Sequence, residues 1–504
     1  MNLVRREQSR RARRAWQGFY ESSIASLLER HQFSSPEANA LELFQAVLRE
    51  VPAYGKFLST QGIAAESVRT FEDFARLPST TKENYQRLHP LPQLCRGGEL
   101  DACDMLAVSS GSSGTPTFWP RFVSDEVGSA MRFEQVLHDS FRADERRTLA
   151  VICFALGNWV GGMYTAACCR ELAAKGYPLT LATPGNQKAE ILRVLGSLRP
   201  HFDQVVLFGY PPFLKDVIDS ARADGFDWTR CPTRLVLAGE VFSEEWRSLV
   251  CERLGVPDPA LSSASLYGTA DGGVLANESP LSVTIRRFLS EHPVPARELF
   301  GEARLPTLCQ YDPLHRYFEL DESELVFSGD GAVPLVRYKI LDRGGVVPFE
   351  RMLAFLHEHD FDPLERCPAP ARERVRRLPF VFVFGRANFA LSFYGANIYP
   401  ENVSVGLEQP ELADAVTGKF VMQLSHDSDL NASLDVSVEL LPGGSPSAEL
   451  ARDISRSIQK HLERLNSEFA HYVPAEHRSP RVRLLGHGDP EYFPVGVKHR
   501  YTRT

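Results

Sequence analysis

Residues 109–117 have the composition of a loop that binds phosphate. They read Ser-Ser-Gly-Ser-Ser-Gly-Thr-Pro-Thr and follow an apolar run over residues 105–108, which predicts a short buried strand. Glycine has no Cβ, so Gly111 and Gly114 let the backbone turn sharply and approach a ligand closely. Hydroxyl groups and free backbone N–H groups can then surround phosphate oxygens. A flexible surface loop can have the same composition, so this stretch alone leaves both interpretations open.

A second stretch, residues 266–271, places a ring, a hydroxyl and a carboxylate around a glycine turn. The ring of Tyr267 can stack on a base, and the carboxylate of Asp271 can hold Mg²⁺ beside phosphates. A β-turn with a structural tyrosine is the commoner arrangement for such a sequence. The stretch is therefore a candidate nucleotide site that needs support from the rest of the chain.

Three further stretches carry polar residues at the ends of expected strands. Asp342 can accept both hydroxyls of a ribose, as acidic residues do in dinucleotide-binding folds, or it can be a turn aspartate. Residues 385–388, Gly-Arg-Ala-Asn, precede a second glycine-containing stretch over 395–401. Lys498 lies close to the end of the chain, where a lysine is commonly just solvated. Each signal is weak alone, and only their order and spacing along the chain indicate a common site.

The elements that must position these residues follow an alternating pattern from residue 148 onward. Continuous apolar strands separated by helices predict parallel strands covered by helices on both faces. Ligands in such folds bind at the carboxyl ends of the strands, and the loop over 109–117 follows a strand end in agreement with this. Strands are expected over residues 149–155, 179–182, 205–208 and 235–238, and helices over 161–174, 187–198, 212–221 and 243–254.

The pattern changes after about residue 300. A β-rich section is expected there, and the charged, proline-containing residues 348–379 predict an irregular insert or a helix with a loop. The last residues form an α+β pattern of ordinary domain size. Its strands are expected over residues 419–424, 434–440 and 481–485, with one long helix near 451–465. We therefore expect an α/β fold with a large N-terminal domain over 1–385 and a small C-terminal domain over 386–504.

The N-terminal residues predict helices that dock on the large domain. Six arginines favour a solvated face on the first helix, and apolar residues at helical spacing favour its docking. Ser35 is suited to cap a second helix, with Pro36 at its first position. The arginines are Arg5, Arg6, Arg10, Arg11, Arg13 and Arg14, and the apolar residues are Trp16, Phe19 or Tyr20, Ile24 and Leu27.

Composition excludes several classes of protein. The chain has 504 residues, of which 43% are hydrophobic and 24% charged, as in an ordinary globular protein. A net charge of −8 gives no sign of nucleic acid as the main partner, and no apolar run is long enough to span a membrane. Nine scattered cysteines without a Cys-x-x-Cys pair favour reduced thiols and a cytoplasmic location.

Two sequence patterns disfavour other kinds of site. No Gly-Lys-Ser/Thr follows the glycine-containing loop, which disfavours a P-loop NTPase. His357 and His359 do not share a helix face, which disfavours a zinc site.

Taken together, the five stretches resemble the motifs of the adenylate-forming enzyme superfamily, and within it the phenylacetate–CoA ligase-like branch. Residues 109–117 resemble its Ser-Ser-Gly-Thr-Thr-Gly phosphate loop, and 267–271 resemble its Tyr-Gly-x-x-Glu motif. Residues 337–342 resemble Arg-Tyr-x-Thr-Gly-Asp, and 385–400 resemble the Gly-Arg segment that opens the mobile C-terminal domain. Lys498 matches the catalytic lysine, and Tyr54 together with residues 71–82 also resembles the same branch.

The resemblance implies a two-step reaction. A carboxylate attacks the α-phosphate of ATP to give an acyl-adenylate and pyrophosphate, and a thiol, usually of coenzyme A, then takes the acyl group. Lys498, Mg²⁺ held by Asp271, and the loop would stabilise charge at phosphorus. The small domain would rotate between the steps, with Asn388 at the pivot. The implied nucleotide-binding residues are Ser109, Ser110, Gly111, Ser112, Ser113, Gly114, Thr115, Tyr267, Gly268, Thr269, Asp342 and Arg386.

By the same analogy, residues after the expected strands line a pocket for the acid. Trp159 and Tyr210 can flank an aromatic or hydrophobic acid, or can be core aromatics. Glu240 can be a pocket residue or a turn residue. The implied pocket residues are Asn158, Trp159, Gly162, Tyr210, Ala238, Gly239, Glu240 and Ser265.

The motifs also depart from the family pattern, and three functions stay open. Asp271 replaces a glutamate, Ile340-Leu341 replaces Thr-Gly, and Asn388 replaces an aspartate. These departures argue more strongly against the thiol-transfer step than against the adenylation step. The first function is an acyl- or aryl-CoA ligase, which the branch suggests could be a homodimer. The second is an enzyme that passes the adenylate to a carrier-protein thiol or an amine. The third is a nucleotide-binding protein without catalysis, against which Lys498 speaks.

Overall fold

The computed structural model describes residues 3–109, 117–157, 160–302, 304–386, 391–394, 396–426, 432–466, 469–470, 473, 475–494 and 499–503. The helices of the N-terminal part are α1 (Leu3–Glu21), α2 (Ile24–Glu29), α3 (Pro36–Glu50), α4 (Pro52–Thr60), α5 (Phe71–Ala75), α6 (Leu91–Leu94) and α7 (Glu126–Gln135). The helices between the sheet strands are α8 (Val160–Ala174), α9 (Lys188–Leu198), α10 (Pro211–Ala223), α11 (Glu244–Arg253), α12 (Pro280–Glu291), α13 (Pro293–Phe300), α14 (Phe349–Glu358), α15 (Pro363–Arg366) and α16 (Ala369–Arg372).

One sheet of 11 strands runs through the large part of the molecule in the order β10-β11-β12-β13-β9-β8-β7-β6-β5-β3-β4. Strands β4, β3, β5, β6 and β7 are parallel, and the pairs from β7 to β10 are antiparallel. The bounds are β3 (Thr148–Ile152), β4 (Leu179–Ala182), β5 (Gln204–Gly209), β6 (Thr233–Ala238), β7 (Ser263–Thr269), β8 (Gly273–Asn277), β9 (Thr307–Gln310), β10 (Tyr317–Asp321), β11 (Glu324–Gly329), β12 (Leu335–Val347) and β13 (Phe380–Arg386). The α/β class and the β-rich section after residue 300 are thereby confirmed.

Alternate residues of the parallel strands pack against two different helix layers. Ala150, Val206 and Val236 belong to an apolar core with α1, α2, α7 and α8. Leu149 and Val205, each one residue earlier along its strand, belong to a second core with α9, α10 and α11. Side chains alternate across a strand, so the continuous apolar runs reflect burial on both faces of the sheet.

The strand before the phosphate-loop sequence does not lie in this large sheet. β1 (Met105–Ser109) pairs with β2 (Thr117–Arg121) as a separate two-stranded antiparallel sheet, with Ser109 opposite Thr117. The expectation that the loop follows a strand of the parallel sheet is therefore corrected. An apolar run predicts a strand but carries no information about its partner, and here the chain turns back on itself.

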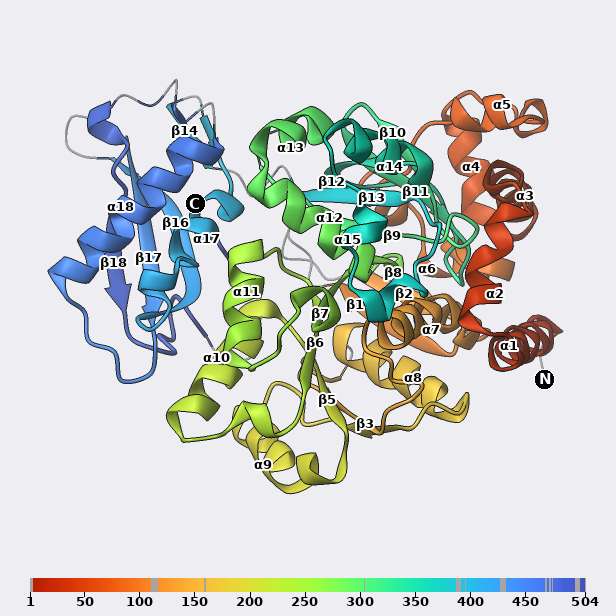
Figure 1. The fold of residues 1–504 in the computed structure, drawn as a ribbon. Helices are drawn as coiled ribbons and strands as arrows, with labels where there is room; N and C mark the ends of the chain where they lie inside the picture. Colours follow the sequence, from red (N-terminus) through yellow and green to blue (C-terminus); the bar gives the residue numbers. More distant parts are fainter. Residues whose placement is uncertain are drawn as a thin grey trace.

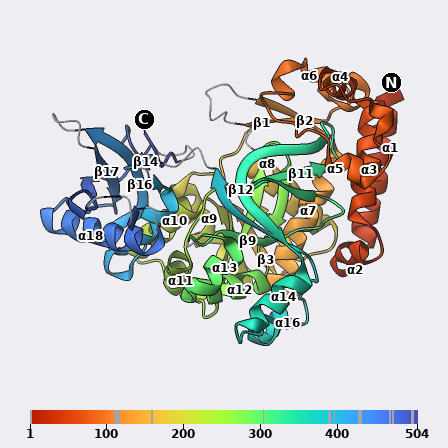
Figure 2. The ribbon, with the colours of Figure 1, turned by 90° about the horizontal axis from the view of Figure 1, so that it is seen from above.

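The C-terminal elements form a unit of their own on the side opposite α1 (Figures 1 and 2). This C-terminal unit contains β14 (Leu391–Phe393), β15 (Ala396–Ile398), α17 (Pro400–Leu407), β16 (Val416–His426), β17 (Ala432–Leu440), α18 (Ala448–Leu465) and β18 (Arg481–Leu485). Strands β16, β17 and β18 make a three-stranded sheet, and the unit has its own apolar core.

Several local expectations are also met. Ser35 accepts a hydrogen bond from the backbone N–H of Ala38 and caps α3, as its position before Pro36 predicts. Residues 348–379 contain the helices α14, α15 and α16 joined by turns. Five of the six arginines of α1 are exposed, as a solvated face predicts, and the half-buried Arg11 forms an ion pair with Asp330. Among the described residues, no helix combines the length and apolar character needed to cross a membrane.

Candidate functional site

The carboxyl ends of three parallel strands, β5, β6 and β7, bring several predicted residues to one edge of the sheet. Tyr210 directly follows β5, and Ala238 is the last residue of β6. In register, Gly209 lies beside Leu237, and Ala238 lies beside Leu266 of β7. Residues 210, 238–240 and 267–269 therefore lie along neighbouring strand ends, the position where open parallel sheets bind ligands.

Two residues predicted to bind the nucleotide touch each other. The hydroxyl of Tyr267 donates a hydrogen bond of 2.8 Å to Oδ2 of Asp342, on β12. The ring of Tyr267 is stacked near that of Phe318, with centroids 6.4 Å apart. The backbone of Asp342 pairs with that of Arg386 at the end of β13. Three stretches far apart in sequence thus meet at one point of the sheet.

Asp271 lies in a nearly inaccessible polar cluster. Its Oδ2 accepts a hydrogen bond of 2.7 Å from the hydroxyl of Tyr338, and its Oδ1 lies 3.0 Å from Nζ of Lys82. The ammonium of Lys82 also lies 5.7 Å from the centroid of Trp119, on β2. Arg121, at the end of β2, donates to the backbone carbonyls of Ala270 and Asp271. The hairpin, the N-terminal region and the motif after β7 therefore converge on this carboxylate.

This geometry does not fit Asp271 as a direct magnesium ligand. Both carboxylate oxygens are engaged by protein donors, and the side chain is 3% exposed. A neighbouring ammonium disfavours a divalent cation, and Mg²⁺ retains several waters when bound. Among the described residues no cluster of three or more histidine, cysteine, aspartate or glutamate side chains could hold a metal ion.

The expected pocket residues differ in what their side chains do. Gly162 lets α8 approach the preceding loop, because a Cβ there would lie 2.3 Å from the backbone oxygen of Ala155. Gly239 has a φ of +83°, and a Cβ there would lie 2.8 Å from the ring of Tyr210. Ser265 is buried within β7, and its backbone N–H donates to Glu278 over 2.7 Å. The two glycines thus serve close packing, and Ser265 belongs to the sheet core.

Tyr210 is the described aromatic residue best placed to meet a substrate. Its ring packs edge-on against Phe154, with centroids 5.0 Å apart, at the ends of β5 and β3. Burial, and then the charge of Glu240, raise the pKa of its hydroxyl. Glu240 itself accepts a hydrogen bond from the hydroxyl of Tyr501, near the end of the chain.

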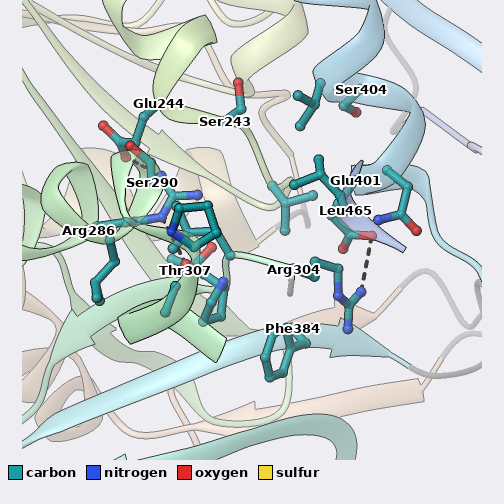
Figure 3. A pocket seen from close by; sticks show the side chains of 18 of the residues that line it. Ser243, Glu244, Arg286, Ser290, Arg304, Thr307, Phe384, Glu401, Ser404 and Leu465 are labelled. Atoms are coloured by element: carbon teal, nitrogen blue, oxygen red, sulfur yellow. Dashed lines mark hydrogen bonds and ion pairs between the residues drawn. The ribbon is translucent and has the colours of Figure 1, made fainter. Parts of the chain in front are cut away.

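A cavity of about 640 Å³ lies between the large part of the molecule and the C-terminal unit (Figure 3). Its lining includes Val241, one residue beyond Glu240, and none of the expected acid-pocket residues that the structure describes lines it. Its walls include Phe384 of β13 and Glu401 of α17, and the Arg304 guanidinium forms an ion pair with Glu401 at 3.3 Å. Burial raises the pKa of Glu401, and Arg304 partly offsets this.

Ten predicted site residues lie outside the described residues, so their placement stays a prediction. They are Ser110, Gly111, Ser112, Ser113, Gly114, Thr115, Asn158, Trp159, Asn388 and Lys498. For Ser109 and Arg386 only the backbone is described.

Sequence reasoning assigned no role to Lys82, Arg121 or Tyr338. Tyr338 lies inside the motif over 337–342, and Lys82 ends the Ser-Thr-Thr-Lys sequence over 79–82. A cationic residue after consecutive hydroxyl residues was the available signal for Lys82. Its proximity to Asp271 depends on the packing of the N-terminal region against the sheet and is not visible in the sequence.

Comparisons with known proteins agree with this architecture. No family model matches the chain. A phenylacetate–coenzyme A ligase of Aromatoleum evansii is 22% identical over 423 residues, which cover 81% of this chain and 83% of that protein. The crystal structure of 2-hydroxyisobutyryl-CoA ligase in the postadenylation state, in complex with R3-HIB-AMP, has a TM-score of 0.66 at 14% identity, covering 93% of this chain and 88% of that chain. An open conformation of the same ligase, with 2-HIB-AMP and CoA, has a TM-score of 0.53 at 13% identity and covers 93% of this chain and 90% of that chain.

These comparisons confirm the resemblance seen in the motifs. The chain is similar in sequence to a phenylacetate–coenzyme A ligase and has the fold of the adenylate-forming ligase to which its structure is similar.

Proposed function

We propose that this protein is an AMP-forming acid–CoA ligase. It would join a carboxylic acid to AMP with release of pyrophosphate, and then transfer the acyl group to the thiol of coenzyme A with release of AMP. The observation that carries the proposal is the contact between Tyr267 and Asp342 beside the backbone of Arg386, because it joins three nucleotide motifs at one strand edge. The similarity to a phenylacetate–coenzyme A ligase supports the same activity.

In this proposal Tyr267 lies beside the adenine and Asp342 accepts the ribose hydroxyls. The loop over 109–115 and Lys498 would stabilise the negative charge that develops at the α-phosphate. ATP chemistry of this kind uses Mg²⁺, and no step proposed here depends on a metal held by Asp271. Residues 386–504 would act as the mobile small domain, which moves between adenylation and thiol transfer about Asn388.

The acid would bind at the ends of β3, β5 and β6. The half-buried ring of Tyr210, held edge-on by the buried Phe154, offers an aromatic surface, which supports an aromatic or hydrophobic acid. Phenylacetate is the acid named for the relative, and it is the first to be tested. A carrier-protein thiol or an amine in place of coenzyme A is the alternative acceptor.

The test is pyrophosphate release from ATP and Mg²⁺ with a panel of aromatic and aliphatic acids, with and without coenzyme A. Acid-dependent release that Lys498→Ala abolishes, together with an acyl-CoA product, is the expected result. Release without acyl-CoA would select another acceptor. ATP binding without release for any acid would favour a nucleotide-binding protein, and no ATP binding would contradict the proposal.

A further inference from the structure

The last described residues, 499–503, attach to the edge of β16. The backbone N–H of Met422 donates to the carbonyl of Tyr501 at 2.7 Å, and the N–H of Arg503 donates to the carbonyl of Met422 at 3.0 Å. The His499 ring contacts the carbonyl of Phe420 through Nε2, at 2.6 Å. The backbone of this segment is therefore held by the C-terminal unit.

The side chain of Tyr501 leaves that unit and reaches the large part of the molecule. Its hydroxyl donates to the carboxylate of Glu240, two residues beyond the end of β6. Burial and the carboxylate of Glu240 raise the pKa of Tyr501 well above its ordinary value, so the phenol keeps the proton that it donates. The contact joins the end of the chain to the loop that carries Gly239, against which Tyr210 packs.

The two parts also touch at the start of α11, where Ser243 donates to Glu408, and along the helices α10 and α11. Arg253 of α11 donates to the carbonyl of Ala413 at 2.7 Å, and Lys215 of α10 donates to the carbonyl of Val416 at 3.0 Å. These contacts hold the body of the C-terminal unit against two helices. The Tyr501 contact differs because it engages the loop at a strand end, beside the candidate substrate site.

We propose that Tyr501 and Glu240 form a positioning pair for the adenylation step. The inference rests on the proposed function, in which Lys498 serves that step. Lys498 precedes Tyr501 by three residues in the sequence, and three residues of extended chain span at most roughly 11 Å. If Tyr501 is fixed on Glu240, this reach would limit how far Lys498 can move from the loop that follows β6. Glu240 then acts through the chain end and does not contact the acid.

The test compares the two half-reactions in Tyr501→Phe and Glu240→Gln. Tyr501→Phe removes only the hydroxyl and keeps the ring that packs at 5.0 Å from Phe420. We expect phenylacetate-dependent ATP–pyrophosphate exchange to fall about tenfold or more, since a hydrogen bond to a charged group is lost. Formation of phenylacetyl-CoA from preformed phenylacetyl-adenylate and CoA should stay within about twofold of wild type.

Arg503→Ala is the matched control on the same segment. Arg503 pairs with Glu491 at 2.9 Å inside the C-terminal unit and does not reach Glu240, so both half-reactions should stay at the wild-type rate. Equal losses in both half-reactions for Tyr501→Phe would indicate a merely structural role and would overturn the proposal. Unchanged exchange in both Tyr501→Phe and Glu240→Gln would overturn it as well.

Hydrogen exchange provides a measurement that needs no substrate. Tyr501→Phe should speed amide exchange in residues 238–245, and Arg503→Ala should not. Absence of this effect contradicts the docking contact even if activity is found. If wild type shows no acid-dependent exchange of pyrophosphate with any acid, the proposed function fails, and hydrogen exchange still decides whether Tyr501 docks on Glu240.

Discussion

At the scale of single residues, the carboxylate of Asp271 is the most constrained group of the candidate site. It is 3% exposed and has one cationic partner in the described structure, Lys82, at 3.0 Å. The Tyr338 hydroxyl is a neutral partner and does not compensate the charge. A buried charge that loses its counter-charge pays the cost of desolvation without the ion pair.

Lys82→Met should therefore lower the free energy of unfolding by about 3 kcal/mol or more. The double variant Lys82→Met with Asp271→Asn should recover most of the loss, because the amide carries no charge. Urea denaturation of the wild type, both single variants and the double variant measures this coupling. A loss below about 0.5 kcal/mol for Lys82→Met would show that water reaches the carboxylate and replaces the lysine.

The packing of Gly162 allows a second prediction at the residue scale. A Cβ at this position would lie 2.3 Å from the backbone oxygen of Ala155, so Gly162→Ala must displace α8 or the loop before it. The expected cost is about 1–3 kcal/mol of stability, read from the urea midpoint. Gly196→Ala, in α9 with no atom within 4 Å of its Cβ position, is the control, and it should stabilise by about 0.4–1 kcal/mol. Equal effects at the two sites would contradict the close packing.

At the scale of elements, β12 contains an irregularity just before Asp342. Leu341 has a φ of +66°, in the left-handed region that costs a non-glycine residue roughly 1–2 kcal/mol. Leu341 stands where the family motif has glycine, and the backbone keeps a conformation that favours glycine. With leucine in place of glycine at position 341, a strained backbone positions Asp342.

Replacing Leu341 with glycine and with alanine separates strain from side-chain loss. Both variants remove the leucine side chain, and only alanine keeps the strain at positive φ. Leu341→Gly should be more stable than Leu341→Ala by about 1 kcal/mol, the reverse of the usual order in a strand. Thermal unfolding of both variants measures the difference. Greater stability of Leu341→Ala would show that the strand relaxes when the leucine is removed.

Elements with strong local signals could be predicted from the sequence. The strand over 179–182 has the expected bounds, and α11 begins after Ser243, whose hydroxyl accepts from the N–H of Trp246. The pairing of β1 with β2 could not be predicted, because an apolar run does not identify its partner. The contact between Lys82 and Asp271 could not be predicted from the sequence either, because it depends on how the N-terminal region packs on the sheet. The motifs identified the nucleotide residues, and the fold revealed which of them touch.

At the scale of the whole molecule, the contact between the large part and the C-terminal unit includes a buried acid. Glu408, at the end of α17, accepts a hydrogen bond from the hydroxyl of Ser243 at the start of α11. Burial raises its pKa to about 7, and the hydrogen bond from Ser243 opposes this increase. The charge of Glu245 raises the pKa slightly further, and the charge of Lys215 lowers it slightly. The carboxyl group is therefore held in its protonated form more strongly in the folded than in the unfolded protein.

This shift predicts that stability falls as the pH rises toward neutrality. The folded pKa of about 7 exceeds the unfolded value of 4.5, so the folded state binds more protons between these values. The stabilisation is fully present below pH 4.5 and is lost as the pH rises through 7, by roughly 2 kcal/mol between pH 5 and pH 7.

Glu408→Gln keeps the size and hydrogen-bonding capacity of the side chain but cannot ionise. The free energy of unfolding of this variant and of wild type is measured in urea at pH 5, 6 and 7. The variant should gain stability relative to wild type as the pH rises, because only wild type acquires the buried charge. A difference that does not change with pH would show that the Glu408 carboxylate is solvated at this contact, and that the two parts separate readily enough to let water in.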